Sequence, residues 1–358
     1  MSQLIQLGEF LMTNGRAEPS IVAAGYWLRK SHLLSIKAEY PISQLKAKGA
    51  VFHIAPGNVD TLFFYSMIIS VLCGNQTILR VSNNVSAEAQ TLLDLLNQFN
   101  AQLETEHVIA SLLTVIQYQR DDIITAKISS ACDSRVIWGG NESIDHICQF
   151  PLVNGNSDNI CFPDRYSVAV IQLKDEVEIN SAVDNLLRDI KPYHQQACSS
   201  PKVVYWLNTA HSLQDKFWLL LDQRLSQQKS LEATELIAQL LYIQRLPLLL
   251  SADKVDKNKC LLKKYDLLQV LEIESISLNS IKSHSGLWVL LSLQINSLGD
   301  IELFEHCQTM TVSGFDKSQC KHWQSTTLQP LKRIVPAGQA LAFSHLWDGV
   351  NLIENLTS

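Results

Sequence analysis

The chain has 358 residues, of which 46% are hydrophobic and 18% are charged. This length suits two domains of about 100–200 residues each, and the composition excludes an intrinsically disordered chain because it can bury a large core. The net charge of −6 argues against a nucleic-acid-binding surface, so we expect no nucleic-acid partner.

The N-terminal segment does not resemble a signal peptide. It lacks the basic flank and long apolar run of a signal peptide, and residues 1–45 are predicted to be an amphipathic helical lead-in without a motif. The longest apolar stretch, near 63–73, is far shorter than the roughly 20 residues that a membrane helix needs. We therefore expect a cytoplasmic protein without a membrane span.

Strands and helices alternate between residues 49 and 150. The apolar pattern predicts strands at 49–55, 76–82 and 112–118, helices at 86–100 and 121–132, and a strand, glycine turn and helix over 134–150. This alternation indicates βαβ units and a parallel sheet. Such a sheet binds ligands at the carboxyl ends of its strands, which here carry the sequences HIAPGN, RVSNN and IWGGNE.

A second α/β region begins near residue 163. We expect a helix at 178–190, a loop containing Cys198, a strand at 202–208 and helical segments across 211–243. The turn formers Asn154–Gly155–Asn156–Ser157–Asp158–Asn159 are the best candidate for a domain crossing. We therefore predict one domain at 1–160, a second at 161–340, and a C-terminal segment at 341–358 that packs back or forms oligomer contacts.

Eight cysteines occur, without a CxxC pair or a His/Cys spacing that resembles a zinc site, so we expect no metal. In a reducing cytosol they should be free thiols, and for most of them the simplest interpretation is a small buried hydrophobe. Cys198 differs because it lies in a polar turn, HQQACSS. The sequence leaves two interpretations of Cys198 about even, a nucleophile or a structural residue. His194 is interpreted as a loop histidine.

Three stretches at the predicted strand ends could serve a ligand, and each has an ordinary structural interpretation. Asn58 could offer its amide to an oxyanion, although a helix N-cap is the commonest reason for Asn there. Arg80 could pair with a ribose phosphate, although a lone Arg is usually a surface charge. The glycine pair in Trp138–Gly139–Gly140–Asn141–Glu142 could approach a phosphate, although an ordinary strand-to-helix turn is the better interpretation.

Six stretches together resemble the acyl-CoA reductase branch of the aldehyde dehydrogenase superfamily, typified by the fatty-acid reductase (LuxC) of bacterial bioluminescence. In order they are VFHIAPGNV, CGNQTILRVS, VIWGGNESI, FPDRYSVAVI, QQACSSPKVVY and KRIVPAGQALAF…WDG. The resemblance runs from about Lys48 to the C-terminus. It implies an α/β, aldehyde dehydrogenase-like fold with a Rossmann-type cofactor domain at 1–160 and an α/β catalytic thiol domain at 161–340.

The resemblance also implies roles for individual residues. Cys198 matches the catalytic thiol that becomes S-acylated, and Asn58 matches the asparagine whose amide holds the oxyanion. Arg80 stands where the superfamily has a lysine near the adenosine ribose, and Arg there is compatible with the 2′-phosphate of NADP. The remaining cofactor-binding candidates are Ser82, Gly139, Gly140 and Asn141, with Gln308 and Thr309 toward the nicotinamide.

One departure from the superfamily bears on the reaction. Oxidising aldehyde dehydrogenases carry a glutamate that activates water, whereas the corresponding stretch here, CFPDRYSVAV, has none, and Asp164 is the nearest acid. An enzyme without an efficient general base protects its acyl-enzyme from hydrolysis. We therefore expect NADPH-dependent reduction of an acyl thioester to the aldehyde, with NADH as the alternative cofactor. NAD-dependent aldehyde oxidation and a non-catalytic scaffold are the alternative functions.

The resemblance further implies the partners. The substrate is an acyl-CoA or an acyl-protein, and members of this family often work beside an acyl-protein synthetase. Superfamily members usually form homo-oligomers, so we expect one here by analogy.

Overall fold

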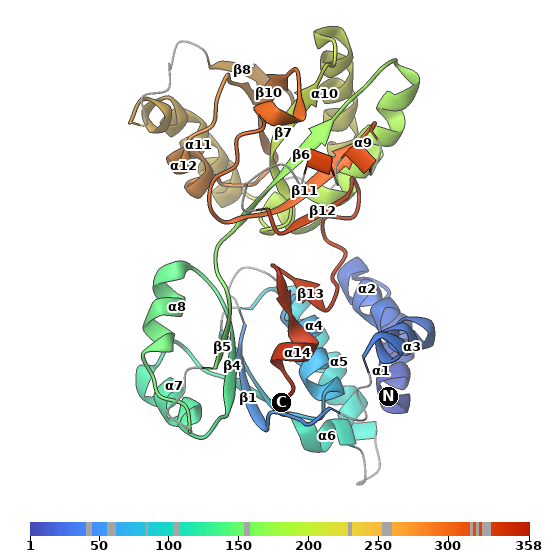
Figure 1. The fold of residues 1–358 in the computed structure, drawn as a ribbon, viewed down its shortest axis with the longest axis vertical. Coiled ribbons are helices and arrows are strands. Elements are labelled where there is room, and N and C mark those ends of the chain that lie inside the picture. The colour runs from blue at the N-terminus through green and yellow to red at the C-terminus, as the bar shows by residue number, and fades with distance from the viewer. Residues whose placement is uncertain are drawn as a thin grey trace. The chain divides into compact units, whose positions relative to one another are not determined.

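The computed structural model describes residues 1–40, 45–55, 62–83, 85–102, 108–153, 158–227, 231–252, 260–315, 318–319, 322–323 and 331–358. Its internal contacts divide the chain into two compact units, shown in Figure 1. Unit 1 comprises Met1–Asp164 and Phe343–Ser358, and unit 2 comprises Arg165–Ala342. The expected crossing at 154–159 falls largely outside the described residues. No described helix combines the length and apolar character needed to span a bilayer.

Unit 1 is built on a five-stranded sheet in the order β3-β2-β1-β4-β5. All neighbouring strands run parallel, which confirms the sheet type predicted from the alternating pattern. The strands are β1 (Ala50–Ile54), β2 (Gln76–Val81), β3 (Leu113–Gln117), β4 (Ser134–Trp138) and β5 (Asn159–Phe162). The chain builds outward from β1 to β3 and then returns to the other side of β1, so the strand order reverses between β1 and β4.

Helices cover both faces of this sheet, as in a doubly wound fold (Figure 1). Apolar side chains of α1, α2, α4 and α5 share one core with Val51, Leu79 and Val136. Side chains of α7 and α8 pack with Phe52 and Ile137 on the opposite face. The helices of unit 1 before the C-terminal segment are α1 (Ser2–Asn14), α2 (Pro19–Trp27), α3 (Lys30–Glu39), α4 (Leu62–Leu72), α5 (Ala87–Gln102), α6 (Val108–Leu112), α7 (Asp122–Ser129) and α8 (Asn141–Cys148).

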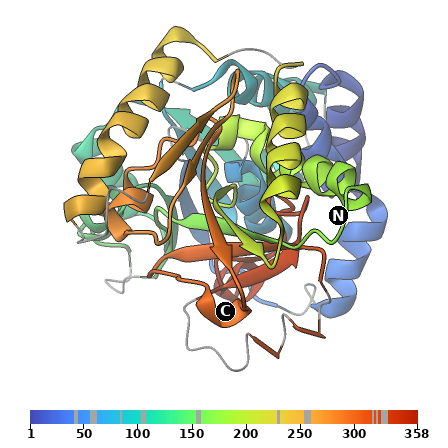
Figure 2. The same ribbon diagram turned by 90° about the horizontal axis from the view of Figure 1, so that it is seen from above.

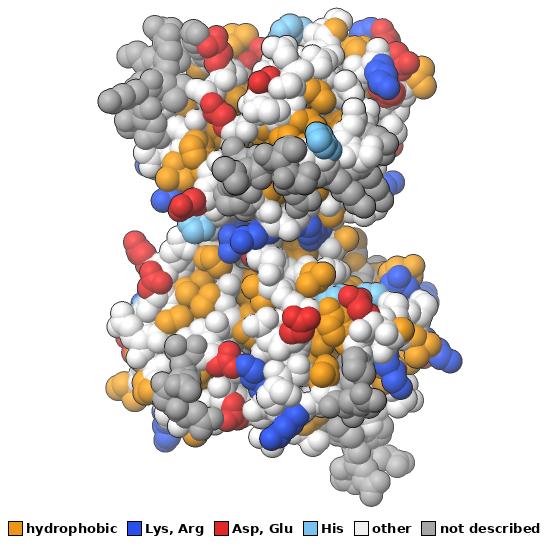
Figure 3. All heavy atoms as spheres, in the orientation of Figure 1, with side chains coloured by type: hydrophobic (Ala, Val, Ile, Leu, Met, Phe, Trp, Pro, Cys, Tyr) orange, Lys and Arg blue, Asp and Glu red, His pale blue; other side chains and the backbone are white. Residues whose placement is uncertain are grey.

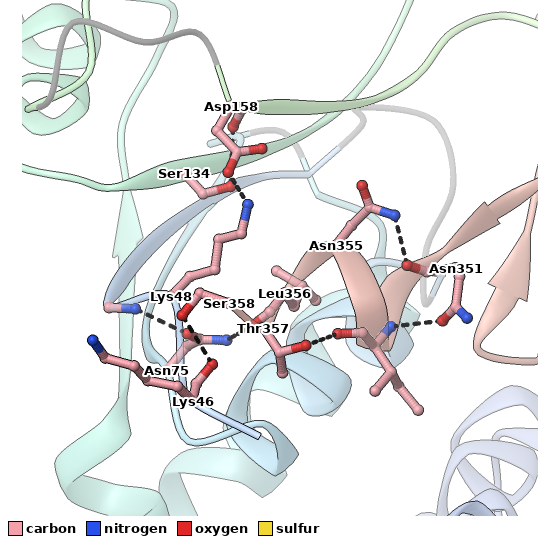
Figure 4. A network of polar contacts seen from close by, with 12 residues as sticks. Lys46, Lys48, Asn75, Ser134, Asp158, Asn351, Asn355, Leu356, Thr357 and Ser358 are labelled. Atoms are coloured by element: carbon pink, nitrogen blue, oxygen red, sulfur yellow. Dashed lines mark hydrogen bonds and ion pairs between the residues drawn. The ribbon is translucent and has the colours of Figure 1, made fainter. Parts of the chain in front are cut away.

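The C-terminal segment belongs to unit 1, where a small hairpin of β13 (Leu346–Trp347) and β14 (Val350–Asn351) leads into α14 (Leu352–Asn355). Figure 4 shows its polar anchors. The side chain of Asn75 donates to the carbonyl of Leu356 at 2.9 Å and accepts from the N–H of Gly49 at 3.1 Å. The last residues are thereby tied to the start of β1.

Unit 2 contains a seven-stranded sheet in the order β12-β11-β6-β7-β10-β9-β8. Its strands are parallel except for β8, which pairs antiparallel with β9. All six residues of β6 are buried, as expected for a parallel strand covered on both faces. The strands are β6 (Tyr166–Ile171), β7 (Pro201–Leu207), β8 (Leu261–Lys264), β9 (Gln269–Glu272), β10 (Val289–Ile295), β11 (Cys307–Ser313) and β12 (Arg333–Pro336).

The helices of unit 2 also lie on two faces. Apolar side chains of α9 (Val177–Ile190) and α10 (His211–Leu225) pack on one face of the sheet. Apolar side chains of α11 (Ala233–Ala252) and α12 (Leu278–Lys282) pack on the other face. Figure 2 shows α9 and α10 in green and yellow and α11 in gold, with the strands of the sheet between them. Successive side chains of each strand point to opposite faces of the sheet and so contribute to the two cores in turn.

Candidate active site

Cys198 lies in a short loop of unit 2, between the 3-10 helix η2 (Pro192–Gln195) and β7. The cysteine is half-buried, whereas its neighbours Ala197, Ser199 and Ser200 are fully buried. Burial raises the pKa of other thiols, such as that of Cys73, to about 12, which makes them poor nucleophiles. Cys198 therefore occupies an accessible position in an otherwise closed part of the fold.

The backbone before Cys198 is strained. Tyr193, His194 and Gln195 have φ angles of 55°, 46° and 65°, which place three successive non-glycine residues in the left-handed region. Each such residue costs about 1 kcal/mol or more, and such residues cluster at functional sites. The surrounding fold must therefore hold this loop in place.

Several hydrogen bonds supply that restraint. The N–H of Leu287 donates to the carbonyl of His194 at 2.7 Å, and the side-chain amide of Gln195 donates to the carbonyls of Pro201 and Val289 at 2.8 Å each. The His194 ring contacts Glu235 of α11, with 2.8 Å between Nδ1 and Oε1. His194 therefore serves as an anchor of the loop, in line with its interpretation as a loop histidine.

Ser167 connects the cysteine to the strand that carries two predicted nicotinamide-site residues. The Ser167 hydroxyl donates to the carbonyl of Cys198 at 2.8 Å and accepts from the N–H of Thr309 at 3.2 Å. Gln308 and Thr309 lie in β11 and are 2% and 0% exposed. Their side-chain oxygens have no hydrogen-bond partner among the described residues. The Ser167 hydroxyl thus links the backbone of Thr309 to the backbone of Cys198.

A buried carboxylate holds the other side of the cysteine loop. The Ser200 hydroxyl donates to the carbonyl of Asp189, at the end of α9, at 2.7 Å. The Asp189 carboxylate accepts the N–H groups of Gly338 and Ala340 at 2.7 and 2.8 Å, and burial raises the pKa of Asp189 to about 6. The sequence VPAGQA, part of the sixth stretch that carries the family resemblance, is thereby fixed beside the loop of Cys198.

The second element of the candidate site is a cavity of about 370 Å³ within unit 1. It lies at the carboxyl ends of the parallel strands, where the strand order reverses. This is where doubly wound sheets bind nucleotides. Its described lining consists of Ile54, Ala55, Arg80, Tyr118, Arg120, Asp122, Thr125, Trp138, Gly139, Gly140, Ser143, His146, Ile147 and Asp164.

Arg80 is the cation that the sequence singled out in this cavity. Its guanidinium donates to the carbonyl of Tyr118 at 2.9 Å and lies 5.1 Å from the centre of the Tyr118 ring. Burial lowers its pKa, yet an arginine side chain stays protonated in proteins. The remaining N–H donors of Arg80 suit an anionic group in the cavity.

The glycine turn after β4 forms the opposite wall. Neither Gly139 nor Gly140 has a positive φ, so the backbone itself does not require glycine here. A Cβ atom on Gly139 would meet only the Cβ of Ser143, at 3.9 Å, whereas one on Gly140 would lie 3.0 Å from Oδ2 of Asp164. Glycine at 139 therefore suits close approach by a ligand, and these residues fit a phosphorylated cofactor.

Three other residues that the sequence predicts for the site do not line this cavity or are not among the residues that the structure describes. Ser82 follows β2 and Asn141 begins α8, next to Arg80 and Gly140 in the chain but outside the described lining. Asn58 falls in the segment 56–61, outside the described residues, so its role stays a prediction.

Sequence reasoning missed Tyr118 and Arg120, which line the same cavity. Both come just after β3 in the sequence QYQRD, and the carboxyl ends of neighbouring parallel strands meet at one edge of the sheet. This rule, applied to the third strand as it was to the others, would have identified them.

Comparison with known proteins assigns the sequence to a family. A model of the acyl-CoA reductase (LuxC) family matches residues 34–235, more than half of the chain. Long-chain acyl-protein thioester reductase 2 of Photobacterium leiognathi is 27% identical over 186 residues, which cover 51% of this chain and 37% of that protein. The corresponding reductase of Aliivibrio fischeri is 27% identical over 164 residues, which cover 45% and 32%. The matched part is thus about a third of the length of these relatives.

Solved structures support the fold. Aldehyde dehydrogenase from Staphylococcus aureus superposes with a TM-score of 0.64 at 15% identity, covering 100% of this chain and 87% of that one. The glyceraldehyde-3-phosphate dehydrogenase GapN from Methanocaldococcus jannaschii, complexed with NADP, gives 0.66 at 12% identity, covering 100% and 85%. At such low identity the likeness shows the fold alone. The expected α/β, aldehyde dehydrogenase-like fold is confirmed.

Proposed function

Because the chain belongs to the acyl-CoA reductase (LuxC) family, we propose that it reduces an acyl thioester to an aldehyde through an S-acyl intermediate on Cys198. The observation that carries the proposal is the setting of Cys198, a half-buried thiol at the end of a strained loop that hydrogen bonds hold in place. Fixing a nucleophile in this way removes orientational entropy from the reaction.

The reaction begins when the thiolate of Cys198 attacks the carbonyl carbon of the thioester. A C–S bond forms, the oxygen gains a negative charge, and the amide of Asn58 with the backbone N–H of Cys198 stabilises it. The thiolate of the carrier then leaves, and the acyl group remains on Cys198. Thiolates leave readily, so this step needs little general acid catalysis.

The cavity of unit 1 is the proposed site of the nicotinamide cofactor. NADPH, when bound, supplies the hydride that reduces the S-acyl group to a thiohemiacetal, which collapses to aldehyde and the Cys198 thiolate. Arg80 would contact the 2′-phosphate of the adenosine ribose, and the Gly139–Gly140 turn would admit the phosphates. Ser82, Asn141, Gln308 and Thr309 complete the proposed cofactor-binding set.

The position of Asp164, the acid nearest in sequence to where oxidising relatives carry the glutamate, favours reduction over oxidation. Asp164 lies in unit 1 and lines the cavity, with Oδ2 beside Gly140. In that position its carboxylate faces the glycine turn of the proposed cofactor site. An S-acyl group without an efficient base for water persists until hydride reaches it.

The proposed substrate is an acyl-CoA or an acyl-protein, in keeping with the names of the curated relatives. We further propose that an acyl-protein synthetase supplies the acyl group in the latter case and that the chain forms a homo-oligomer. NADPH is the proposed cofactor and NADH the alternative.

Intact-protein mass spectrometry after mixing the protein with a panel of acyl-CoAs, without NADPH, tests the proposal. We expect one acyl adduct on Cys198, discharged when NADPH is added. Cys198→Ala should lose the adduct and all turnover but still bind NADPH, because the cofactor cavity lies in unit 1. Cys260→Ala, which removes another half-buried thiol of unit 2, should keep both. Turnover by Cys198→Ala would refute the mechanism.

A further inference from the structure

Two cysteines of unit 1 lie in contact on the face of the sheet that α7 and α8 cover. Cys148 is the last residue of α8 and Cys161 lies in β5, and their Sγ atoms are 3.8 Å apart. Both thiols are half-buried, and Figure 3 shows hydrophobic side chains at the surface of unit 1 where α8 lies. The pair is therefore partly accessible to solvent, unlike the fully buried Cys132 on the same face.

A buried arginine lies beside this pair without an acidic partner. Arg135 of β4 is 0% exposed. Within the described part of the chain its guanidinium donates only to neutral acceptors, which are the side chains of Asn159 and Ser129 and the carbonyls of Ile147 and Phe150. A buried cation without a counter-ion is costly. An anion that formed close to Arg135 would therefore be stabilised.

The groups that can supply this anion are thiols. Arg135 interacts electrostatically with three cysteines, most strongly with Cys148 and then with Cys161 and Cys132. Burial raises the pKa of Cys132 to about 11, so this residue stays a thiol. A nearby guanidinium favours a thiolate, and the thiolate is the form that attacks a disulfide. The interaction with Arg135 thus identifies Cys148 as the attacking group.

We propose that Cys148 and Cys161 form a redox-active dithiol that a low-molecular-weight disulfide, such as glutathione disulfide, oxidises reversibly. The Cys148 thiolate attacks one sulfur of glutathione disulfide, and one glutathione leaves as its thiolate. Cys161 then loses its proton and attacks the sulfur of Cys148, and the second glutathione leaves. The two cysteines lose two electrons and two protons, which the two molecules of reduced glutathione carry away.

The two thiols act in sequence because ionisation of Cys161 depends on the charge of Cys148. Burial, together with the charge and the hydrogen bond of Cys148, raises the pKa of Cys161 to about 12. The mixed disulfide removes the charge of Cys148 while the Arg135 guanidinium remains, so Cys161 ionises more easily at that stage. The sulfur atoms then need to approach from 3.8 Å to about 2.0 Å, the length of the new bond.

The disulfide would act on the cavity of unit 1. Ser143, His146 and Ile147 of α8 line that cavity, and a bond between Cys148 and Cys161 draws the last turn of α8 toward β5. The lining residues move with the helix, so the oxidised protein should bind NADPH more weakly than the reduced protein. This consequence rests on the proposed function, whereas the dithiol itself does not.

Mass spectrometry of the Cys198→Ala variant tests the dithiol, because this variant lacks the proposed catalytic thiol and the readout needs no turnover. After treatment with glutathione disulfide we expect a loss of about 2 Da, the mass of two hydrogens. Proteolysis should release a linked pair of peptides that contain Cys148 and Cys161, and dithiothreitol should separate them. A protein that carries only glutathione adducts, without this link, would overturn the proposal.

Serine variants in the same background test the roles of the two thiols. Cys161→Ser should accumulate a mixed disulfide with glutathione on Cys148, whereas Cys148→Ser should form no link and modify Cys161 at least about tenfold more slowly. Cys260→Ser, which removes a half-buried thiol of unit 2, should form the link normally. Arg135→Gln should slow the modification of Cys148 about tenfold. If that variant does not fold, the two serine variants still identify the attacking thiol, and faster modification of Cys161 would overturn its assignment.

Nicotinamide fluorescence tests the effect on the cavity. The dissociation constant of NADPH should rise about tenfold on oxidation and return to its first value on reduction, and Cys148→Ser should not respond to the oxidant. Formation of the link without a change in NADPH affinity would overturn the effect on the cavity. Absence of NADPH binding in both redox states would refute the proposed cofactor site and leave the dithiol intact.

Discussion

The hydroxyl of Ser167 donates a hydrogen bond to the backbone carbonyl of Cys198 at 2.8 Å. Ser167 is fully buried in β6, and its oxygen also accepts the N–H of Thr309 from β11 at 3.2 Å. One small side chain therefore ties the backbone of the proposed nucleophile to two strands of the sheet. Because the N–H of the same cysteine is proposed to bind the oxyanion, its backbone orientation should control the rate of acylation.

We predict that Ser167→Ala slows acylation of Cys198. Without the hydroxyl, the carbonyl of Cys198 loses its donor, which should lower the free energy of unfolding by about 1–3 kcal/mol. The freed backbone should also align less often with the substrate, and we expect the acylation rate to fall about tenfold. Rapid mixing with acyl-CoA followed by mass spectrometry gives the rate, and chemical denaturation gives the stability.

Ser134→Ala is the control for a purely structural effect. Ser134 is also buried, and its hydroxyl donates to the carbonyl of Asp158 at 3.0 Å within unit 1. We expect a similar loss of stability with an unchanged acylation rate. Equal slowing in the two variants would show that the Ser167 contact has no special link to the nucleophile.

A second prediction concerns the cation in the cavity of unit 1. Arg80→Gln removes the charge proposed to contact the 2′-phosphate, so the dissociation constant of NADPH should rise about 10- to 100-fold, as expected for a charged hydrogen bond. The dissociation constant of NADH, which lacks this phosphate, should change little. Nicotinamide fluorescence measures both constants.

Arg29→Gln provides a matched control for this experiment. The guanidinium of Arg29 also lies over a tyrosine ring, 4.1 Å from the centre of Tyr26, but Arg29 lies outside the cavity lining. Its loss should leave the affinity for both cofactors unchanged. If Arg80→Gln weakens the binding of NADH and of NADPH equally, Arg80 does not contact the 2′-phosphate.

The glycine turn gives a third prediction. Gly139→Ala adds a Cβ atom whose nearest protein neighbour is 3.9 Å away, and the backbone does not have a positive φ. The melting temperature should therefore stay near the wild-type value, whereas the dissociation constant of NADPH should rise about tenfold if the cofactor approaches this backbone closely. A variant that melts normally and binds NADPH with wild-type affinity would exclude Gly139 from the site.

The sequence predicts the architecture of unit 1 well because its signals are local. The alternation of apolar strands and amphipathic helices between residues 49 and 150 indicates a parallel sheet, and the structure confirms it. Arg80 lies near the carboxyl end of β2 and Gly139 and Gly140 follow β4, so the topology alone brings them to one edge of the sheet, where they line the cavity.

The surroundings of Cys198 could not be predicted in the same way. Its polar turn is visible in the sequence, but the contacts that hold it come from Ser167, Glu235 and Leu287, which lie far away in the chain. Nor does the sequence mark Tyr193, His194 and Gln195 as a left-handed run, since only a few per cent of non-glycine residues have a positive φ and only His of these three types is enriched there. Tertiary contacts impose it, and only the structure reveals them.

The imidazole of His53 is buried, and no acidic group among the described residues pairs with it to stabilise its protonated form. His53 lies in β1 and is 1% exposed. Its Nε2 has no hydrogen-bond partner among the described residues, and its Nδ1 lies 3.5 Å from the hydroxyl of Ser66. Burial lowers the pKa of His53 to about 3, whereas an unfolded chain has a histidine pKa of about 6.5.

We predict that this difference makes the fold sensitive to acid. Between pH 6.5 and about 3 the unfolded state binds a proton at His53 that the folded state does not, so the free energy of unfolding decreases as the pH falls through this window, by up to about 5 kcal/mol. His53→Leu should flatten that dependence by one proton, as measured by urea denaturation at a series of pH values. His284→Leu, which removes another buried histidine with a lowered pKa, should flatten it separately. An unchanged slope in His53→Leu would mean that the folded protein accepts the charge, through water or a local rearrangement of β1.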